Sequence, residues 1–371
     1  MESRVRLLMF LLWILSLVAG CSTAESGLQS LAASEQPLFS CGGDQSGRYY
    51  KSINFLIGAG GRVYLWDSVN FEGLDVYSPD GKFLFTLGKK GQGPDELPNV
   101  AAAAADSKGR LWVNVFSQKM LKVFSPDGKL IREVLLPEEI SRGYINRMLF
   151  GAGDELYIQS DSGAGEYSVH GFYPEEGRTR LFHEEKGRKE GGLARFFTDL
   201  AVDDTGKLYI SDPFDYRIYV YSPEGVLIRT YENRRARKER ILDSDFDILN
   251  GDLNSVIRFE GYREVLARLK GPSRYFPAVF GLNVDRGRLY VWTSQRESRL
   301  NRYIVDIYDP DFQRLGRACY FNWIKMNLAR IVNARLYIPS IENYDTSLVR
   351  KLGRMGLTNV PEKLNVYQIR N

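Results

Sequence analysis

A short pattern of an apolar residue, an aromatic residue and a second apolar residue recurs along the chain. Its six copies are Val63-Tyr64-Leu65, Leu111-Trp112-Val113, Leu156-Tyr157-Ile158, Leu208-Tyr209-Ile210, Leu289-Tyr290-Val291 and Leu336-Tyr337-Ile338. The steps between the copies are 48, 45, 52, 81 and 47 residues. Apart from one long insertion, this is the spacing of the four-stranded blades of a β-propeller. The repeat therefore predicts an all-β chain with six four-stranded antiparallel blades.

Turn signals follow these anchor strands where the fold needs a second hairpin. Ser78–Gly81, Ser125–Gly128 and Ser222–Gly225 each combine a proline, which fixes φ, with a glycine, which tolerates positive φ. The strands that enter these turns, such as Ile218–Tyr221, carry apolar or aromatic residues on both faces. This pattern is typical of a sheet packed between two neighbours.

The sixth unit lacks a fourth strand at the C-terminal end. Leu364–Tyr367 matches a third strand, and the sequence ends at Asn371. Leu38–Cys41 stands before the first anchor at nearly the distance that a fourth strand keeps elsewhere. We expect this N-terminal strand to complete the last blade and close the ring. The propeller then spans residues 38–371.

The long insertion between blades four and five contains a helical pattern. Apolar residues from Val256 to Leu269 recur at a spacing of about 3.6 residues, which predicts a short helix. A basic run, Arg234–Arg240, precedes it. A solvated loop is the simpler interpretation of this run, and contact with anionic lipid or polysaccharide is the alternative.

The N-terminal sequence predicts export. An apolar run from Leu7 to Val18 follows two arginines and is the length of a signal-peptide core. Val18-Ala19-Gly20-Cys21 resembles the bacterial lipobox, in which the cysteine receives a lipid. We expect residues 1–20 to be a signal peptide, Cys21 to be lipidated and residues 21–37 to form a flexible tether. Ser22 after the cysteine favours the outer membrane of the cell envelope. The alternative is an ordinary secretory signal in which Cys21 is incidental.

Composition narrows the function classes. A net charge of +4 on 371 residues, 26% of them charged, is too small a basic excess to suggest a nucleic-acid partner. Lipidation of Cys21 would leave Cys41 and Cys319, which we place in the outer strands of blades six and five. Because the outer strands of adjacent blades diverge, we expect two free thiols.

Few residues in the sequence support catalysis. The two histidines, His170 and His183, are too few for the metal sites of propeller lyases, and no Gly-x-Ser-x-Gly motif is present. Asp67, Asn114 and Asp212 end corresponding strands and could gather calcium at the ring mouth. The simpler interpretation is that each bonds the backbone of its own following turn.

The loop Gly88–Leu97 is rich in glycine and contains two lysines. It could bind phosphate, but it lacks the Gly-Lys-Ser/Thr sequence that opens a helix. A passage from the rim of one blade to the axis of the next is the simpler interpretation. Here and at Asp199–Asp212 the chain resembles bacterial six-bladed β-propellers related to NHL-repeat proteins. The resemblance covers residues 38–371 and implies a six-bladed ring, often in lipoproteins.

In a propeller, the loops between second and third strands share one face with the loops that enter each blade. The candidate binding face comprises Trp66, Asp67, Asn114, Asp212, Phe214, Tyr216, Arg217 and Trp292. We expect a membrane-anchored extracytoplasmic binding module that needs no cofactor and recognises an envelope protein or polysaccharide. The alternative is a metal-dependent enzyme, similar to propeller lactonases or lyases, that acts at the axial mouth with calcium.

Overall fold

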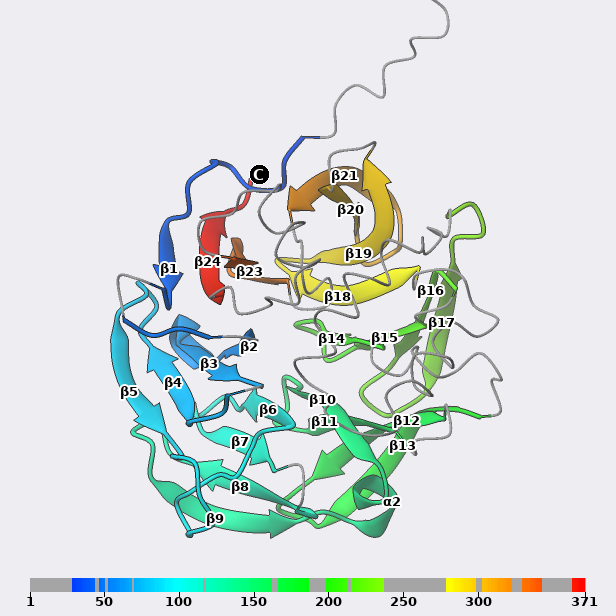
Figure 1. The fold of residues 1–371 in the computed structure, drawn as a ribbon. Coiled ribbons are helices and arrows are strands. Elements are labelled where there is room, and N and C mark those ends of the chain that lie inside the picture. Colours follow the sequence, from blue (N-terminus) through cyan, green and yellow to red (C-terminus); the bar gives the residue numbers. More distant parts are fainter. Residues whose placement is uncertain are drawn as a thin grey trace, which may run out of the picture.

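The computed structural model describes residues 29–43, 47–50, 53–68, 70–115, 118–161, 166–186, 198–212, 215–236, 278–297, 302–321, 329–341 and 362–370. Six four-stranded antiparallel sheets surround a central axis (Figure 1). The predicted six-bladed propeller is confirmed. The predicted helix at 256–269 lies outside the described residues, and so does the basic run beyond Ala236.

Each blade runs from an inner strand at the axis to an outer strand at the rim. Blades one to three contain β2 (Ile53–Ile57), β3 (Val63–Asp67), β4 (Leu74–Tyr77) and β5 (Phe83–Leu87); β6 (Ala102–Ala105), β7 (Leu111–Asn114), β8 (Met120–Phe124) and β9 (Leu130–Leu135); and β10 (Tyr144–Phe150), β11 (Leu156–Asp161), β12 (Tyr167–Tyr173) and β13 (Arg178–Glu185).

Blades four to six continue the same order around the ring. They contain β14 (Leu200–Val202), β15 (Leu208–Asp212), β16 (Arg217–Tyr221) and β17 (Leu227–Glu232); β18 (Val279–Asp285), β19 (Arg288–Glu297), β20 (Arg302–Tyr308) and β21 (Arg314–Phe321); and β22 (Arg330–Val332), β23 (Arg335–Ile341), β24 (Glu362–Gln368) and β1 (Phe39–Cys41). Two short helices, η1 (Ala59–Gly61) and α2 (Glu138–Ser141), lie in connections between strands.

The anchor pattern marks the second strand of every blade. All five residues of β3 are buried, and so are all those of β7, β11 and β15. A strand buried on both faces needs apolar or aromatic residues at successive positions, which explains why the pattern does not alternate. The turn glycines Gly81, Gly128 and Gly225 have φ of 86°, 87° and 83°, as the turn sequences predict.

The predicted ring closure is confirmed. β1 pairs antiparallel with β24, with Phe39 opposite Val366 and Cys41 opposite Leu364. In Figure 1 the blue first strand lies beside the red last strand. Both ends of the chain therefore build the same blade.

The expected flexible tether is partly ordered. Residues 29–33, which we call the strap, cross from the outer strand of blade five to the end of blade six. The Leu31 amide donates to Cys319 O at 2.7 Å, and the Ala33 amide donates to Gln368 O at 2.7 Å. The Leu31 side chain is only 3% exposed and packs in the core between these two blades. A leucine in a polar segment gave no periodic signal, so the sequence pattern missed this contact.

Cys41 and Cys319 are buried free thiols in the outer strands of blades six and five. The Cys319 Sγ donates to Gln29 O at 3.5 Å. Burial raises the pKa of Cys41 to about 12. Within the described part of the chain, no helix combines the length and apolar character that crossing a bilayer requires.

Candidate functional site

The polar residues predicted for the binding face end their strands and bond locally. Asp67 Oδ1 accepts the Asn70 amide at 3.1 Å, and Asp212 Oδ1 accepts the Asp215 amide at 3.3 Å. The Asn114 side chain donates to Met120 O at 3.4 Å. All three predicted side chains are buried. The structure therefore supports the simpler interpretation, in which they shape the following turn.

Arg217 has acidic neighbours within its own blade. Its guanidinium lies 3.6 Å from Asp212, 3.5 Å from Glu232 and 3.9 Å from Asp215, and its side chain is 27% exposed. Asp212 and Arg217 are brought together, as expected for one site, but chiefly as partners of each other.

The aromatic residues predicted to stack on a ligand lie in the core of the blades instead. Trp66 is 5% exposed, Tyr216 is 3% exposed and Trp292 is fully buried. The Tyr216 hydroxyl donates to Asp306 at 2.8 Å, and the Trp292 indole donates to Asn283 Oδ1 at 2.7 Å. The buried rings of Tyr216 and Trp292 are not exposed for stacking on a ligand. Trp66 borders the axial cavity described below, and its indole Nε1 has no hydrogen-bond partner among the described residues. Phe214 lies outside the described residues.

The glycine-rich loop Gly88–Leu97 surrounds a cation. Lys122, a buried residue of β8, donates from Nζ to Gly93 O at 3.2 Å, Pro94 O at 2.9 Å and Glu96 O at 2.8 Å. The Gly93 amide donates to the Glu96 side chain at 2.8 Å, so that this N–H already has an acceptor. Carbonyls that converge on an ammonium group do not suit phosphate. We call this arrangement the Lys122 site.

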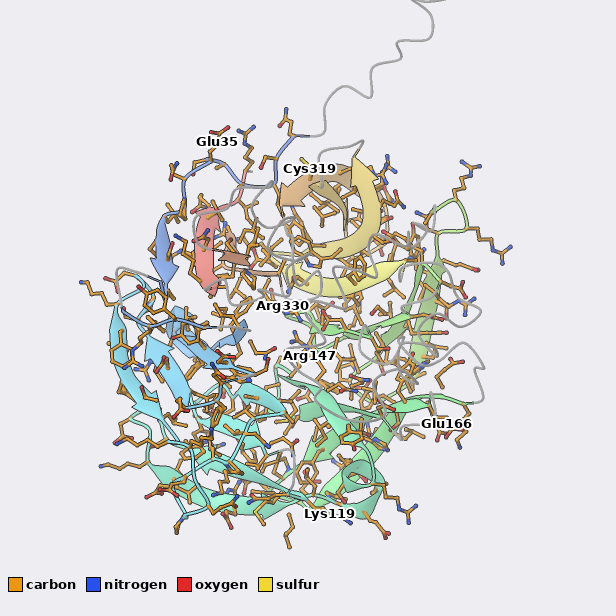
Figure 2. All side chains as sticks on the ribbon, viewed as in Figure 1. Glu35, Lys119, Arg147, Glu166, Cys319 and Arg330 are labelled. Atoms are coloured by element: carbon orange, nitrogen blue, oxygen red, sulfur yellow. The ribbon has the colours of Figure 1, made fainter. Side chains whose placement is uncertain are left out.

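A cavity of about 420 Å³ lies at the ring axis. Inner strands of all six blades line it, and Figure 2 shows Arg147 and Arg330 in this central region. Its polar lining includes Asn54 of β2, Asn146 of β10 and Asn283 of β18. The inner strands all begin on the face where the second strands end. Of the described residues predicted for the binding face, Trp66 lines this cavity.

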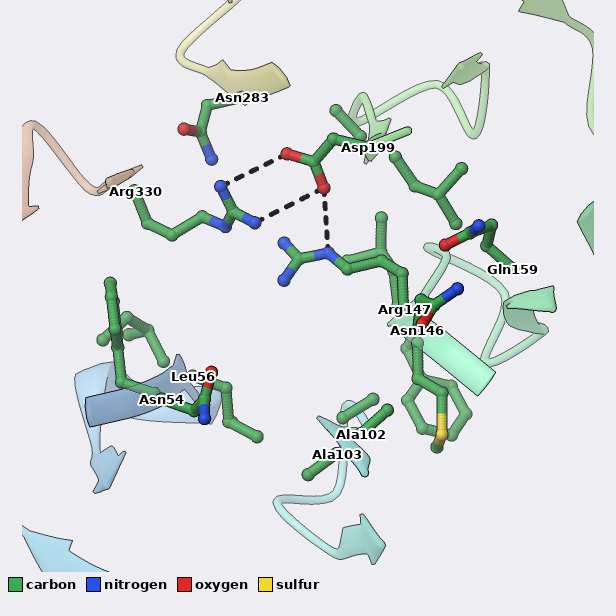
Figure 3. A pocket seen from close by; sticks show the side chains of 18 of the residues that line it. Asn54, Leu56, Ala102, Ala103, Asn146, Arg147, Gln159, Asp199, Asn283 and Arg330 are labelled. Atoms are coloured by element: carbon green, nitrogen blue, oxygen red, sulfur yellow. Dashed lines mark hydrogen bonds and ion pairs between the residues drawn. The ribbon is translucent and has the colours of Figure 1, made fainter. Parts of the chain in front are cut away.

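Three charged residues from three blades meet in this cavity; we call them the axial cluster. Arg147 Nε lies 2.9 Å from Asp199 Oδ1. Arg330 approaches both oxygens of Asp199, with Nη1 at 3.2 Å from Oδ2 and Nη2 at 3.4 Å from Oδ1. Figure 3 shows the carboxylate between the two guanidinium groups. Asp199 is 4% exposed, so this is a largely buried ion cluster.

Backbone groups hold Asp199 in place. The Leu282 amide donates to its Oδ2 at 3.0 Å, and its own amide donates to Ser211 Oγ at 2.9 Å. A Cβ on Gly281 would lie 3.1 Å from Asp199 Oδ2 and 3.2 Å from the Trp292 ring, which is tighter than ordinary contact. The register of β18 also shifts at this glycine. Glycine therefore allows strand β18 to approach the carboxylate closely.

The lining of the cavity carries an excess of positive charge. Among its described residues, Arg147 and Arg330 are cationic and Asp199 is the one acid. Burial, together with the neighbouring Arg147, lowers the pKa of Arg330 to about 10. The cavity thus destabilises the charged form of an arginine even though Asp199 is present.

A positional signal in the sequence could have found this site. Nine residues before the first anchor residue of blades one to five stand Asn54, Ala102, Arg147, Asp199 and Phe280. All five line the cavity. The position nine residues before an anchor therefore faces the axis. Sequence reasoning that looked for local motifs missed it, because the charged residues lie far apart in the chain.

The side chains present do not fit a calcium or catalytic metal site at the axial mouth. Calcium requires several oxygen ligands, and the only carboxylate of the described cavity lining is already ion-paired with two arginines and accepts one backbone amide. Two guanidinium groups repel a cation. Across the described residues, no group of three or more His, Cys, Asp or Glu is placed to hold a metal.

No protein-family model and no curated protein matches the chain. Solved structures do: a predicted exported protein of Bacteroides fragilis is 15% identical with a TM-score of 0.51, over 90% of this chain and 94% of that one. Regucalcin, a calcium-binding protein of Agrobacterium tumefaciens, is 13% identical with a TM-score of 0.49, over 92% and 96%. A gluconolactonase of Xanthomonas campestris is 14% identical with a TM-score of 0.46, over 91% and 88%. The likeness to the Bacteroides protein extends to the fold alone, and by its six sheets this chain is a six-bladed β-propeller.

Proposed function

We propose that this chain is a lipid-anchored binding protein of the bacterial cell envelope that holds a small polar ligand in its axial cavity. The observation that carries the proposal is a cavity of about 420 Å³ whose polar groups come from separate blades. A concave site with a few convergent polar groups is the usual form of a small-molecule site. The ligand is a free small molecule or the end unit of an envelope polysaccharide.

Binding is favoured over catalysis by the groups at the site. The described lining has no histidine, cysteine, lysine or tyrosine to transfer a proton or attack a substrate. Asp199 is held by ion pairs with two arginines and by a hydrogen bond from the Leu282 amide. The cavity is thus equipped to hold a ligand and has no evident general acid or base.

The anchoring part of the proposal depends on the Val18–Cys21 sequence. We expect Cys21→Ala to abolish incorporation of labelled fatty acid into the protein in growing cells. Labelling equal to that of the parent would reject lipidation and leave binding in the cavity to be judged separately.

The binding part is tested by filling the cavity. Ala103 of β6 lines it, and Figure 3 places this residue at its wall. Native mass spectrometry of the full chain, purified gently from its own envelope, should detect a co-purifying small molecule. Ala103→Trp should abolish this species because the indole fills the space, whereas Ala103→Ser should retain it. A species bound equally to the tryptophan variant, or none bound to the parent, would contradict an axial ligand site.

A further inference from the structure

The donors and acceptors of the axial cluster are unequal. A carboxylate has about four lone-pair sites, whereas each guanidinium has five N–H donors. Asp199 accepts hydrogen bonds from the Leu282 amide and Arg330 Nη2, and it forms ion pairs with Arg147 Nε and Arg330 Nη1. One carboxylate therefore faces two guanidinium groups, and the cluster has N–H donors in excess of acceptors.

The unused donors belong chiefly to Arg147. Its ion pair with Asp199 runs through Nε at 2.9 Å, yet Nε makes no hydrogen bond, and among the described residues neither of its Nη atoms has a partner. The side chain is 25% exposed, in contrast to the buried Arg330. In Figure 3 the two Nη atoms point away from Asp199 into open space, with Asn54 and Leu56 on the far side. A planar pair of N–H donors matches the two oxygens of a carboxylate or phosphate.

A β-bulge explains how β10 presents this group. The pairing with β11 passes from Ile145 to Arg147 and skips Asn146, so that both Asn146 and Arg147 border the cavity. Bulges are a common means of redirecting a side chain at a site. The Asn146 Nδ2 is buried and has no acceptor among the described residues. It is a second donor without a partner in the lining.

We propose that the axial cluster binds an oxyanion, the carboxylate or phosphate group of a small ligand, on the free Nη atoms of Arg147 and beside Arg330. This inference rests on the proposed function and adds the chemical class of the ligand. Asp199 is a positioning residue: it holds both guanidinium groups and leaves the terminal donors of Arg147 for the ligand. An anion there neutralises the excess positive charge of the cavity lining.

The test uses the full chain in detergent and low-chloride buffer, with inorganic phosphate and malonate as probes. Phosphorus NMR line width measures phosphate binding, and displacement by malonate measures carboxylate binding. We expect one saturable site for which the two anions compete. Whichever anion binds more tightly indicates whether the natural ligand carries a phosphate or a carboxylate.

Variants locate the site. Arg147→Gln should weaken phosphate binding at least about tenfold, since it removes a charge-assisted pair of hydrogen bonds. Arg147→Lys keeps the charge without the planar donors and should bind with intermediate affinity. Arg110→Gln is the matched control, because Arg110 lies outside the cavity lining, is similarly exposed and also pairs with an aspartate, Asp106, through Nε. Its phosphate affinity should equal that of the parent, and melting temperatures should show every variant to be folded.

The anion proposal is overturned if the folded parent binds neither probe, or if Arg147→Gln binds phosphate as well as Arg110→Gln does. If the co-purifying species is nevertheless lost in Ala103→Trp, the cavity binds a neutral ligand and the proposed function stands. If that species is also unaffected, both proposals fail.

Discussion

The molecule buries cations in two contrasting ways, at the Lys122 site and at the axial cluster. Lys122 has three N–H donors, and three backbone carbonyls accept from them, with Glu133 at 3.7 Å. In the axial cluster two guanidinium groups share one carboxylate, and Arg147 keeps donors without partners among the described residues. A buried cation with a full set of acceptors holds the fold together. A cation whose N–H donors lack acceptors can bind a ligand.

Other buried charges follow the pattern of Lys122. Asp75 and Asp306 occupy corresponding positions in the third strands of blades one and five. Asp75 accepts from Arg48, Tyr50 and Thr86, all within 2.7 Å. Asp306 accepts from Tyr216 at 2.8 Å and Arg317 at 2.7 Å. Charges between blades are therefore matched with partners, and the axial cluster is the exception among these sites.

The largest effect on stability is expected for Asp199→Asn, because this substitution leaves two guanidinium groups without a counter-charge. Breaking a buried ion pair from one side lowers the free energy of unfolding by about 3 to 5 kcal/mol. Urea denaturation measures the loss, and phosphate should restore part of it by supplying the missing negative charge. A loss below about 1 kcal/mol, the range of an exposed pair, would mean that the cluster is well solvated.

Lys122→Met should lower the free energy of unfolding by about 2 to 3 kcal/mol, because the carbonyls of the Gly88–Leu97 loop lose a shared donor. Phosphate should not restore this loss, since the Lys122 site has acceptors to fill and no spare donors. Lys129→Met, at an exposed lysine, is the control and should leave stability unchanged. If phosphate restored the stability of Lys122→Met, the Lys122 site and the axial cluster would not differ in their capacity to bind an anion.

Gly281→Ala should lower the free energy of unfolding by about 1 to 3 kcal/mol, because the added methyl group crowds the Asp199 carboxylate and the Trp292 ring. It should also weaken phosphate binding by displacing the residue that orients Arg147. Gly316→Ala in β21 is the matched control, since its Cβ would meet no atom within 4 Å. Equal melting temperatures for the two variants would show that β18 tolerates the crowding.

The smallest effect on stability is expected for Arg147→Gln. Its partly exposed ion pair contributes about 1 kcal/mol or less, and its removal relieves repulsion of Arg330. Thermal unfolding of the variant without added anion should match the parent closely, although phosphate binding is lost. A drop as large as that of Asp199→Asn would make Arg147 a structural residue like Lys122.

The fold was predictable because each blade repeats one local pattern. The anchor strands and the Pro-Gly turns depend on residues close together in the chain. The closure by Leu38–Cys41 joins distant segments, and it was predictable because the repeat count left the last blade one strand short. The site was not predictable in this way, since Arg147, Asp199 and Arg330 belong to three blades and each looks ordinary in its own segment. Asp67 and Asp212 share a position in the repeat because each accepts a hydrogen bond from the backbone of the turn that follows its strand. Their shared position therefore has a structural reason. The strap was missed because Leu31 is a single apolar residue among polar ones.

If Cys21 carries a lipid, the strap would also limit the position of the ring relative to the membrane. Gln29 is eight positions after Cys21, and a fully extended chain of that length spans at most about 28 Å. Gln29 is already fixed to the outer strand of blade five. Blades five and six are then the ones kept beside the bilayer, and blades two and three, across the ring in Figure 1, reach furthest from it. A lipid on Cys21 would therefore give the propeller one side that faces the membrane and one side that faces away from it.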